Sequence, residues 1–109
     1  MDAYRRLLVA VDLTDDSRAV GVRAKALAAA SGADVTLLHV VEYVPVEPMG
    51  ETLLPAVEIE QELVRRGSER LRALARDLGL PESACRVEAG NTKAEIVRIA
   101  AETGAELVV

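Results

Sequence analysis

The chain has 109 residues, half of them hydrophobic but only 2% aromatic, and its formal net charge is -5 at pH 7. This length predicts one domain over residues 1–109, able to bury about two-thirds of the surface that the unfolded chain exposes. The acidic balance argues against nucleic acid and against an acidic membrane surface as partners, because both are bound through clustered Lys and Arg.

Cysteine and histidine occur once each, as Cys85 and His39. This excludes a disulfide framework and any metal site that needs several Cys or His ligands. The sequence shows no basic and apolar leader, and no apolar stretch approaches the roughly 20 residues of a transmembrane helix. These features predict a cytoplasmic protein without a membrane anchor.

The first predicted element is a strand from Leu7 to Val11, a continuous apolar run typical of a parallel sheet that is buried on both faces. Asp12 follows it directly. Because ligands of open α/β sheets bind at the carboxyl ends of strands, Asp12 is the first candidate functional residue. An alternative stays open, in which its carboxylate only bonds to loop amides and helps the next helix to begin.

A helix is expected next, because Thr14-Asp15-Asp16-Ser17 offers an N-cap and two acids for a first helical turn. Ser31-Gly32 should end this helix, and a second buried strand is predicted from Ala33 to Val41. His39 lies inside that strand. A lone histidine in an apolar strand indicates hydrogen-bonded structure rather than a catalytic base.

The segment from Glu42 to Pro55 is predicted to be a long loop, since it contains three prolines and a glycine. It would leave the same sheet edge as Asp12, either as a lid or partner contact or as a spacer. A second helix is predicted from Ala56 to Leu78. Its apolar stripe includes Gly67, where the sheet should approach closely, and its charged face should be solvated and carry local ion pairs.

The stretch from Ala84 to Ala89 alternates and predicts an exposed edge strand, with Cys85 as a small apolar filler. Thr92 and Glu95 have the spacing of a capping box at the start of a third helix. Glu106 to Val109 begins a fourth strand. The alternation of strands and helices predicts an α/β fold with a three-layer, doubly wound parallel sheet.

Several chemistries are disfavoured. The sequence contains no G-x-G-x-x-G, G-x-x-x-x-G-K-[ST] or G-x-S-x-G motif, which removes the common phosphate cradles and the nucleophile elbow. A phospho-receiver domain would need an aspartate after the third strand, where Glu88-Ala89-Gly90 stands. An enzyme is not expected from these residues, because no general base with a partner can be named. The fold predicts a pocket where the first and fourth strands separate, with Asp12 on one wall.

Three motifs in order carry a resemblance to a known family. They are Val9-Ala10-Val11-Asp12 with its acidic helix start, Leu37-Leu38-His39-Val40-Val41, and Val87-Glu88-Ala89-Gly90-Asn91-Thr92 leading into Glu95-Ile96-Val97. Over nearly the whole chain, the sequence resembles the universal stress protein family. The resemblance implies a five-stranded parallel fold of the adenine nucleotide alpha hydrolase type, a cytoplasmic homodimer and a role in the stress response.

The resemblance also implies a site for ATP or AMP, with Mg²⁺ accompanying ATP. Any ATP hydrolysis there should be slow at most. Asp12 matches the acid that contacts the adenosine end of the nucleotide, and Val40 matches the residue whose backbone meets adenine. Ala10 and Leu13 flank this pocket, and Gly90 matches the glycine after the third strand. The family also contains members that bind no nucleotide. The alternative function is therefore a stress protein that acts through dimerisation and partner contacts.

The chain departs from the nucleotide-binding group at its C-terminal end. In that group a glycine-rich G-x2-G-x9-G-[ST] stretch follows the fourth strand and cradles the phosphates, and a fifth strand comes after it. The printed chain stops at Val109, where this stretch would begin. Asp15 and Asp16 cannot replace it, because carboxylates at a helix start repel an anion. We therefore expect a domain truncated after its fourth strand, with weak affinity for ATP.

Overall fold

The computed structural model describes residues 5–42 and 56–109, which form a parallel sheet in the order β3-β2-β1-β4. The strands are β1 (Arg6–Ala10), β2 (Asp34–Val41), β3 (Cys85–Ala89) and β4 (Leu107–Val108). The helices are α1 (Ser17–Ser31), α2 (Ala56–Leu78), α3 (Thr92–Thr103) and the short 3-10 helix η1 (Glu82–Ala84). The segment 43–55, which contains the predicted loop, lies outside the described residues.

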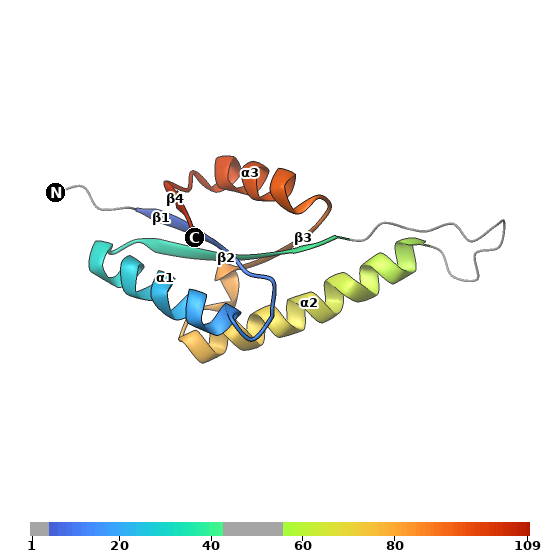
Figure 1. The fold of residues 1–109 in the computed structure, drawn as a ribbon, viewed down its shortest axis with the longest axis horizontal. Coiled ribbons are helices and arrows are strands. Elements are labelled where there is room, and N and C mark those ends of the chain that lie inside the picture. Colours follow the sequence, from blue (N-terminus) through green and yellow to red (C-terminus); the bar gives the residue numbers. More distant parts are fainter. Residues whose placement is uncertain (1–4, 43–55) are drawn as a thin grey trace.

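The helices cover both faces of the sheet, with α1 and α2 on one face and α3 on the other (Figure 1). This arrangement confirms the predicted three-layer, doubly wound α/β architecture. It follows from the order of the strands, because the chain crosses to the second face after it leaves the edge strand β3 and returns to pair β4 with β1.

The apolar run of β1 is buried on both faces, as its composition predicts. Leu8 packs with Leu38 and Ile99 under α3, whereas Val9 packs with Leu37 and the apolar stripe of α2. Successive strand residues point to opposite faces, so each of the two helical layers receives every second residue. Side chains of β1 and β2 therefore form the centre of both core clusters.

Glycine allows α2 to approach its neighbours closely. A Cβ atom on Gly67 would lie 3.0 Å from Cδ2 of His39 in β2, which confirms the predicted close approach of the sheet. A Cβ atom on Gly21 in α1 would lie 2.5 Å from Cδ1 of Leu78. The close packing of α1 and of α2 on this face therefore requires glycine, which has no side chain, at one contact of each helix.

Two predicted helix starts are wrong by about a turn or less. Helix α1 begins at Ser17, so Asp15 and Asp16 precede its first turn, and Asp16 makes no side-chain capping bond. In α3 the cap is Asn91, whose Oδ1 accepts a bond from the N–H of Ala94 at 3.0 Å. The capping box predicted from Thr92 does not form, because Asn91 is extended and occupies the N-cap position ahead of it.

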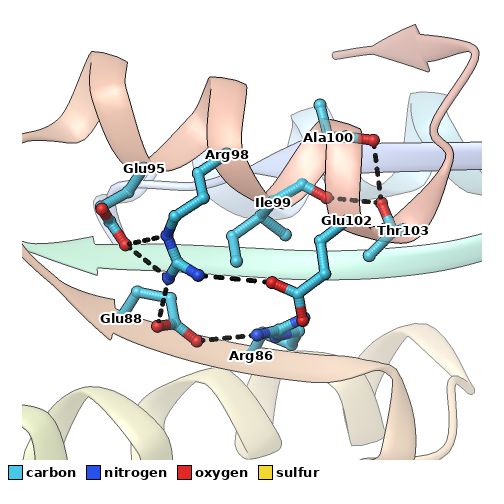
Figure 2. Close-up of polar contacts among 8 residues, drawn as sticks. All are labelled: Arg86, Glu88, Glu95, Arg98, Ile99, Ala100, Glu102 and Thr103. Carbon is cyan, nitrogen blue, oxygen red and sulfur yellow. Dashed lines mark hydrogen bonds and ion pairs between the residues drawn. The ribbon is translucent and has the colours of Figure 1, made fainter.

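The edge strand β3 is joined to α3 by a network of ion pairs (Figure 2). The guanidinium of Arg98 contacts Glu95 at 2.7 Å within α3 and Glu88 at 2.8 Å on β3. Arg86 on β3 contacts Glu88 at 3.1 Å and Glu102 of α3 at 3.0 Å. All β3 residues are half-buried rather than alternating as predicted, because α2 covers one face and this network covers the other.

Candidate functional site

A cavity of about 360 Å³ opens over the carboxyl ends of β1 and β2, between the start of α1 and the start of α3. Its apolar lining comprises Ala10, Val11, Val20, Leu38, Val40 and Ile96. Its polar lining comprises Asp12, Asp16, Ser17, His39 and Thr92. Such a mixture of apolar walls and a few polar groups is typical of a small-molecule site.

The position of the cavity differs from the predicted one, because no β4 residue lines it. The segment after β4 stays paired with β1, since the N–H of Ala10 donates to Val109 at 3.1 Å. On its other side β1 ends early. The N–H of Val11 makes its last bond to β2 at Leu38, while β2 continues to Val41. The sheet edge therefore has a notch where β2 extends past the end of β1, and the cavity opens over this notch.

The loop between β1 and α1 is organised around the carboxylate of Asp12. Its Oδ1 accepts bonds from the hydroxyl of Thr14 at 2.7 Å, from the N–H of Thr14 at 3.1 Å and from the hydroxyl of Ser17 at 3.1 Å. These bonds, with that of the Thr14 hydroxyl the largest, hold the pKa of Asp12 below its ordinary value. Asp12 is therefore ionised at neutral pH and exposed at the rim of the cavity.

Three of the four predicted site residues lie together around the cavity, namely Ala10, Asp12 and Val40. Leu13 does not join them. Its backbone is left-handed, with φ of 61°, and its side chain is buried in the core cluster beneath α1 and α2. Its carbonyl oxygen accepts a bond from Nη2 of Arg70, which belongs to the charged face of α2 that we expected to be solvated.

His39 supports the backbone at the notch. Its Nδ1 lies 2.9 Å from the carbonyl oxygen of Val11, and a carbonyl can only accept, so the proton resides on Nδ1. The predicted structural role of this histidine agrees with that contact. If β1 were longer, the carbonyl of Val11 would pair with the next N–H of β2. In this structure it bonds to the side chain of His39 instead.

The backbone of Val40 faces the cavity side of β2. In a parallel ladder, alternate residues direct their N–H and C=O groups to opposite neighbours. Leu38 bonds toward β1 and Val41 accepts a bond from Gly90 on the β3 side, so the polar groups of Val40 point toward β1. Beside Val40 there is no β1 residue to pair with, because β1 has ended and the chain turns away at Asp12. Val40 therefore presents main-chain groups at the notch.

The opposite wall is set by a contact between the end of β2 and the start of α3. The carboxylate of Glu42 accepts a bond from the N–H of Thr92 at 2.6 Å. Bonds from the hydroxyl and the N–H of Thr92 hold the pKa of Glu42 below its ordinary value. The lining residues Thr92 and Ile96 are thereby fixed beside β2.

The sequence did not predict that five residues near the starts of α1 and α3 line the cavity. They are Asp16, Ser17, Val20, Thr92 and Ile96. The available signal was the parallel sheet itself. A helix that follows a parallel strand begins at the edge where that strand ends, so its first turns border the same cavity. No sequence signal marks Arg70, because its contact with Leu13 depends on how α2 packs.

The fold and the cavity define a three-layer parallel α/β protein with a cavity at the carboxyl ends of two adjacent strands. A model of the universal stress protein family matches residues 3–109, and the chain belongs to this family. Universal stress protein A homolog 1 from Coxiella burnetii is 29% identical over 107 residues, which cover 97% of this chain and 74% of that protein.

Two solved structures share the fold. A functionally unknown protein from Pseudomonas aeruginosa PAO1 gives a TM-score of 0.68 at 16% identity, over 97% of this chain. The match spans only 36% of that protein's length. A universal stress protein solved in complex with cAMP gives a TM-score of 0.62 at 21% identity, over 98% of this chain and 75% of its own.

The described residues contain no cluster of three or more His, Cys, Asp or Glu side chains placed to hold a metal ion. In the same residues, no helix combines the length and the apolar character needed to cross a membrane.

Proposed function

We propose that the protein binds an adenine nucleotide, ATP or AMP, in the cavity over the carboxyl ends of β1 and β2. The observation that carries this proposal is the pairing of an apolar floor, formed by Ala10 and Val40, with the fixed carboxylate of Asp12 at the rim. A planar base fits between apolar walls, and a carboxylate accepts bonds from ribose hydroxyls.

The main chain of Val40 supplies the base-recognition element of the proposal. Its N–H and C=O groups point into the notch beyond β1, where they can bond to the edge of a purine. The bonds to Asp12 involve only Oδ1 among the described residues, which leaves Oδ2 for the ribose. Mg²⁺ is expected to enter as the counterion of ATP. The solved relative in complex with cAMP supports a nucleotide as ligand.

The test is a calorimetric titration of the protein with adenosine, AMP and ATP. Asp12→Ala should abolish binding of each ligand while circular dichroism shows that the fold is retained. Asp15→Ala is the matched control, because it removes the same charge from the same loop, outside the cavity lining. Unchanged affinity of the Asp12→Ala variant would contradict the assigned role.

We also propose that the protein is a cytoplasmic homodimer. Exposed apolar side chains support association, among them Val97 on α3, which is 71% exposed, and Val108 on the edge strand β4, which is 44% exposed. Native mass spectrometry tests this proposal. A dimer carrying the mass of an adenine nucleotide is expected, and a bare 11.6 kDa species would contradict both the dimer and the retained ligand.

The second candidate function, partner binding without a nucleotide, rests on the segment from Glu42 to Pro55. Of this segment the structure describes only Glu42, whose carboxylate bonds to α3. Its test is the same titration, because a dimer that binds none of the three ligands would favour the partner-binding function.

A further inference from the structure

Two successive residues at the end of β2 bond to the turn that leads into α3. The carbonyl oxygen of Val41 accepts a bond from the N–H of Gly90 at 3.0 Å. The carboxylate of Glu42 accepts a bond from the N–H of Thr92 at 2.6 Å. Thr92 is the first residue of α3, so its N–H is one of the donors that a helix cannot pair within itself. Glu42 therefore fixes where α3 begins relative to β2.

The first turn of α3 forms one wall of the cavity. Thr92 and Ile96 both line it, and they lie one helical turn apart on the same side of the helix. Ile96 also packs against the core cluster of Leu8, Leu38 and Ile99. A shift of this turn away from β2 would therefore move the polar and the apolar part of the wall together.

We propose that Glu42 is a positioning residue, which holds the first turn of α3 against β2 and so fixes the wall on which the base of the ligand packs. The inference rests on the proposed function, since it adds a residue to that same site. Glu42 is not among the residues that line the cavity, and it acts through Thr92 and Ile96.

The strength of the contact sets the size of the expected effect. Its lowered pKa keeps Glu42 ionised at neutral pH, so the bond to Thr92 is charge-assisted and lies at the positive end of the α3 dipole. If the bond is lost, the binding-competent position of α3 becomes less populated. The affinity for a ligand falls in proportion to that population.

The experiment is a calorimetric titration of the wild type, Glu42→Ala and Glu42→Gln with adenosine, AMP and ATP. Glu42→Ala should weaken the binding of all three about fivefold, because the wall contacts the base that they share. Loss of a negative charge alone would instead favour AMP and ATP over adenosine. Glu42→Gln should recover most of the affinity, since its amide oxygen can still accept the bond from Thr92.

Glu102 offers a matched control at the opposite end of α3. Its carboxylate also joins the helix to the sheet, by bonds to Arg86 on β3 and to Arg98 (Figure 2). Glu102→Ala removes a carboxylate and a contact of α3 as Glu42→Ala does, but at a distance from the cavity wall. We expect it to leave the three affinities unchanged.

The donor can be removed independently of the acceptor. Proline lacks an N–H and is well tolerated at the first position of a helix. Asn91, which precedes Thr92, already has the extended backbone that a following proline requires, with φ of -80° and ψ of 126°. If the bond carries the effect, the losses of affinity caused by Glu42→Ala and Thr92→Pro should not add in the double variant.

The possible failures separate this inference from the proposed function. If none of the ligands binds to the wild type, both fall. If Glu42→Ala binds adenosine as tightly as the wild type, the nucleotide site stands and only the positioning role is wrong. Equal losses in Glu42→Ala and Glu102→Ala, or additive losses in the double variant, would also overturn that role. A glutamine variant as weak as the alanine variant would do the same.

Discussion

Nδ1 of His39 lies 2.9 Å from the carbonyl oxygen of Val11, and this bond holds the chain at the point where it leaves β1. Replacing His39 with leucine should leave that carbonyl without a partner in a half-buried place. We expect the free energy of unfolding to fall by about 1–3 kcal/mol, measured by urea denaturation. His39→Asn should recover part of the loss, because its amide can donate from a similar position. A leucine variant as stable as the wild type would contradict this role.

The contact between Gly67 and His39 predicts that two substitutions are coupled. Alanine in place of glycine normally stabilises a helix interior by about 1 kcal/mol. At Gly67 the added Cβ would lie 3.0 Å from a ring that its bond to Val11 holds in place, so Gly67→Ala should destabilise the wild type. In a His39→Ala background the same change should stabilise. Urea denaturation of the four proteins gives the coupling, and simple additivity would count against the contact.

Stability should decline in acid because several carboxylates have lowered pKa values in the folded state. Bonds from Arg65 and Arg66 lower the pKa of Glu62 to about 2, and Arg98 lowers that of Glu95. A carboxylate with a lowered folded pKa stabilises the fold above its unfolded pKa, and loses this effect as the pH falls through the folded value. The decline should therefore run from about pH 4.5 toward pH 2. Urea midpoints measured across this range test it, and Glu62→Gln should flatten the slope.

Arg70 positions the loop that carries Asp12, since it donates to the carbonyl of Leu13. Arg70→Met keeps the apolar stem and removes the bond. We expect the affinity for adenosine to fall about tenfold, because the loop that carries Asp12 would no longer be held in place. The thermal midpoint should also fall by several degrees, because a hydrogen bond from a charged group stabilises the fold by about 1.5–3 kcal/mol. Arg76→Met is the matched control, because Arg76 lies in the same helix and its side chain makes no hydrogen bond to the described residues. If the two variants bound adenosine with equal affinity, Arg70 would not position the loop.

The order and type of the elements were predictable because each has a local signal. The apolar run after Arg6 predicts a buried strand, and Gly32 and Gly104 end their helices in the left-handed conformation. The α/β class follows from the alternation of these elements. The helix starts were predicted less well, since several polar residues in a row can serve as the cap and packing selects one of them.

The candidate site was only partly predictable for a different reason. Asp12, Ala10 and Val40 were identified through position at strand ends and through resemblance, and the cavity brings them together. The side of β1 on which the cavity opens depends on which strand extends further, and that length is set by pairing across the sheet. The inward turn of Leu13 likewise depends on its left-handed backbone, which no glycine marks in the sequence.

The three bonds to Asp12 give this residue a structural role that is independent of any ligand. Its Oδ1 shapes the turn through Thr14 and Ser17, so natural selection for folding alone would preserve an aspartate here. A descendant that lost its ligand would keep Asp12 and drift first at positions that line the cavity without bonding to the loop. Ala10 and Val40 are such positions. Substitutions there, with Asp12 unchanged, would mark a lineage that no longer binds the ligand.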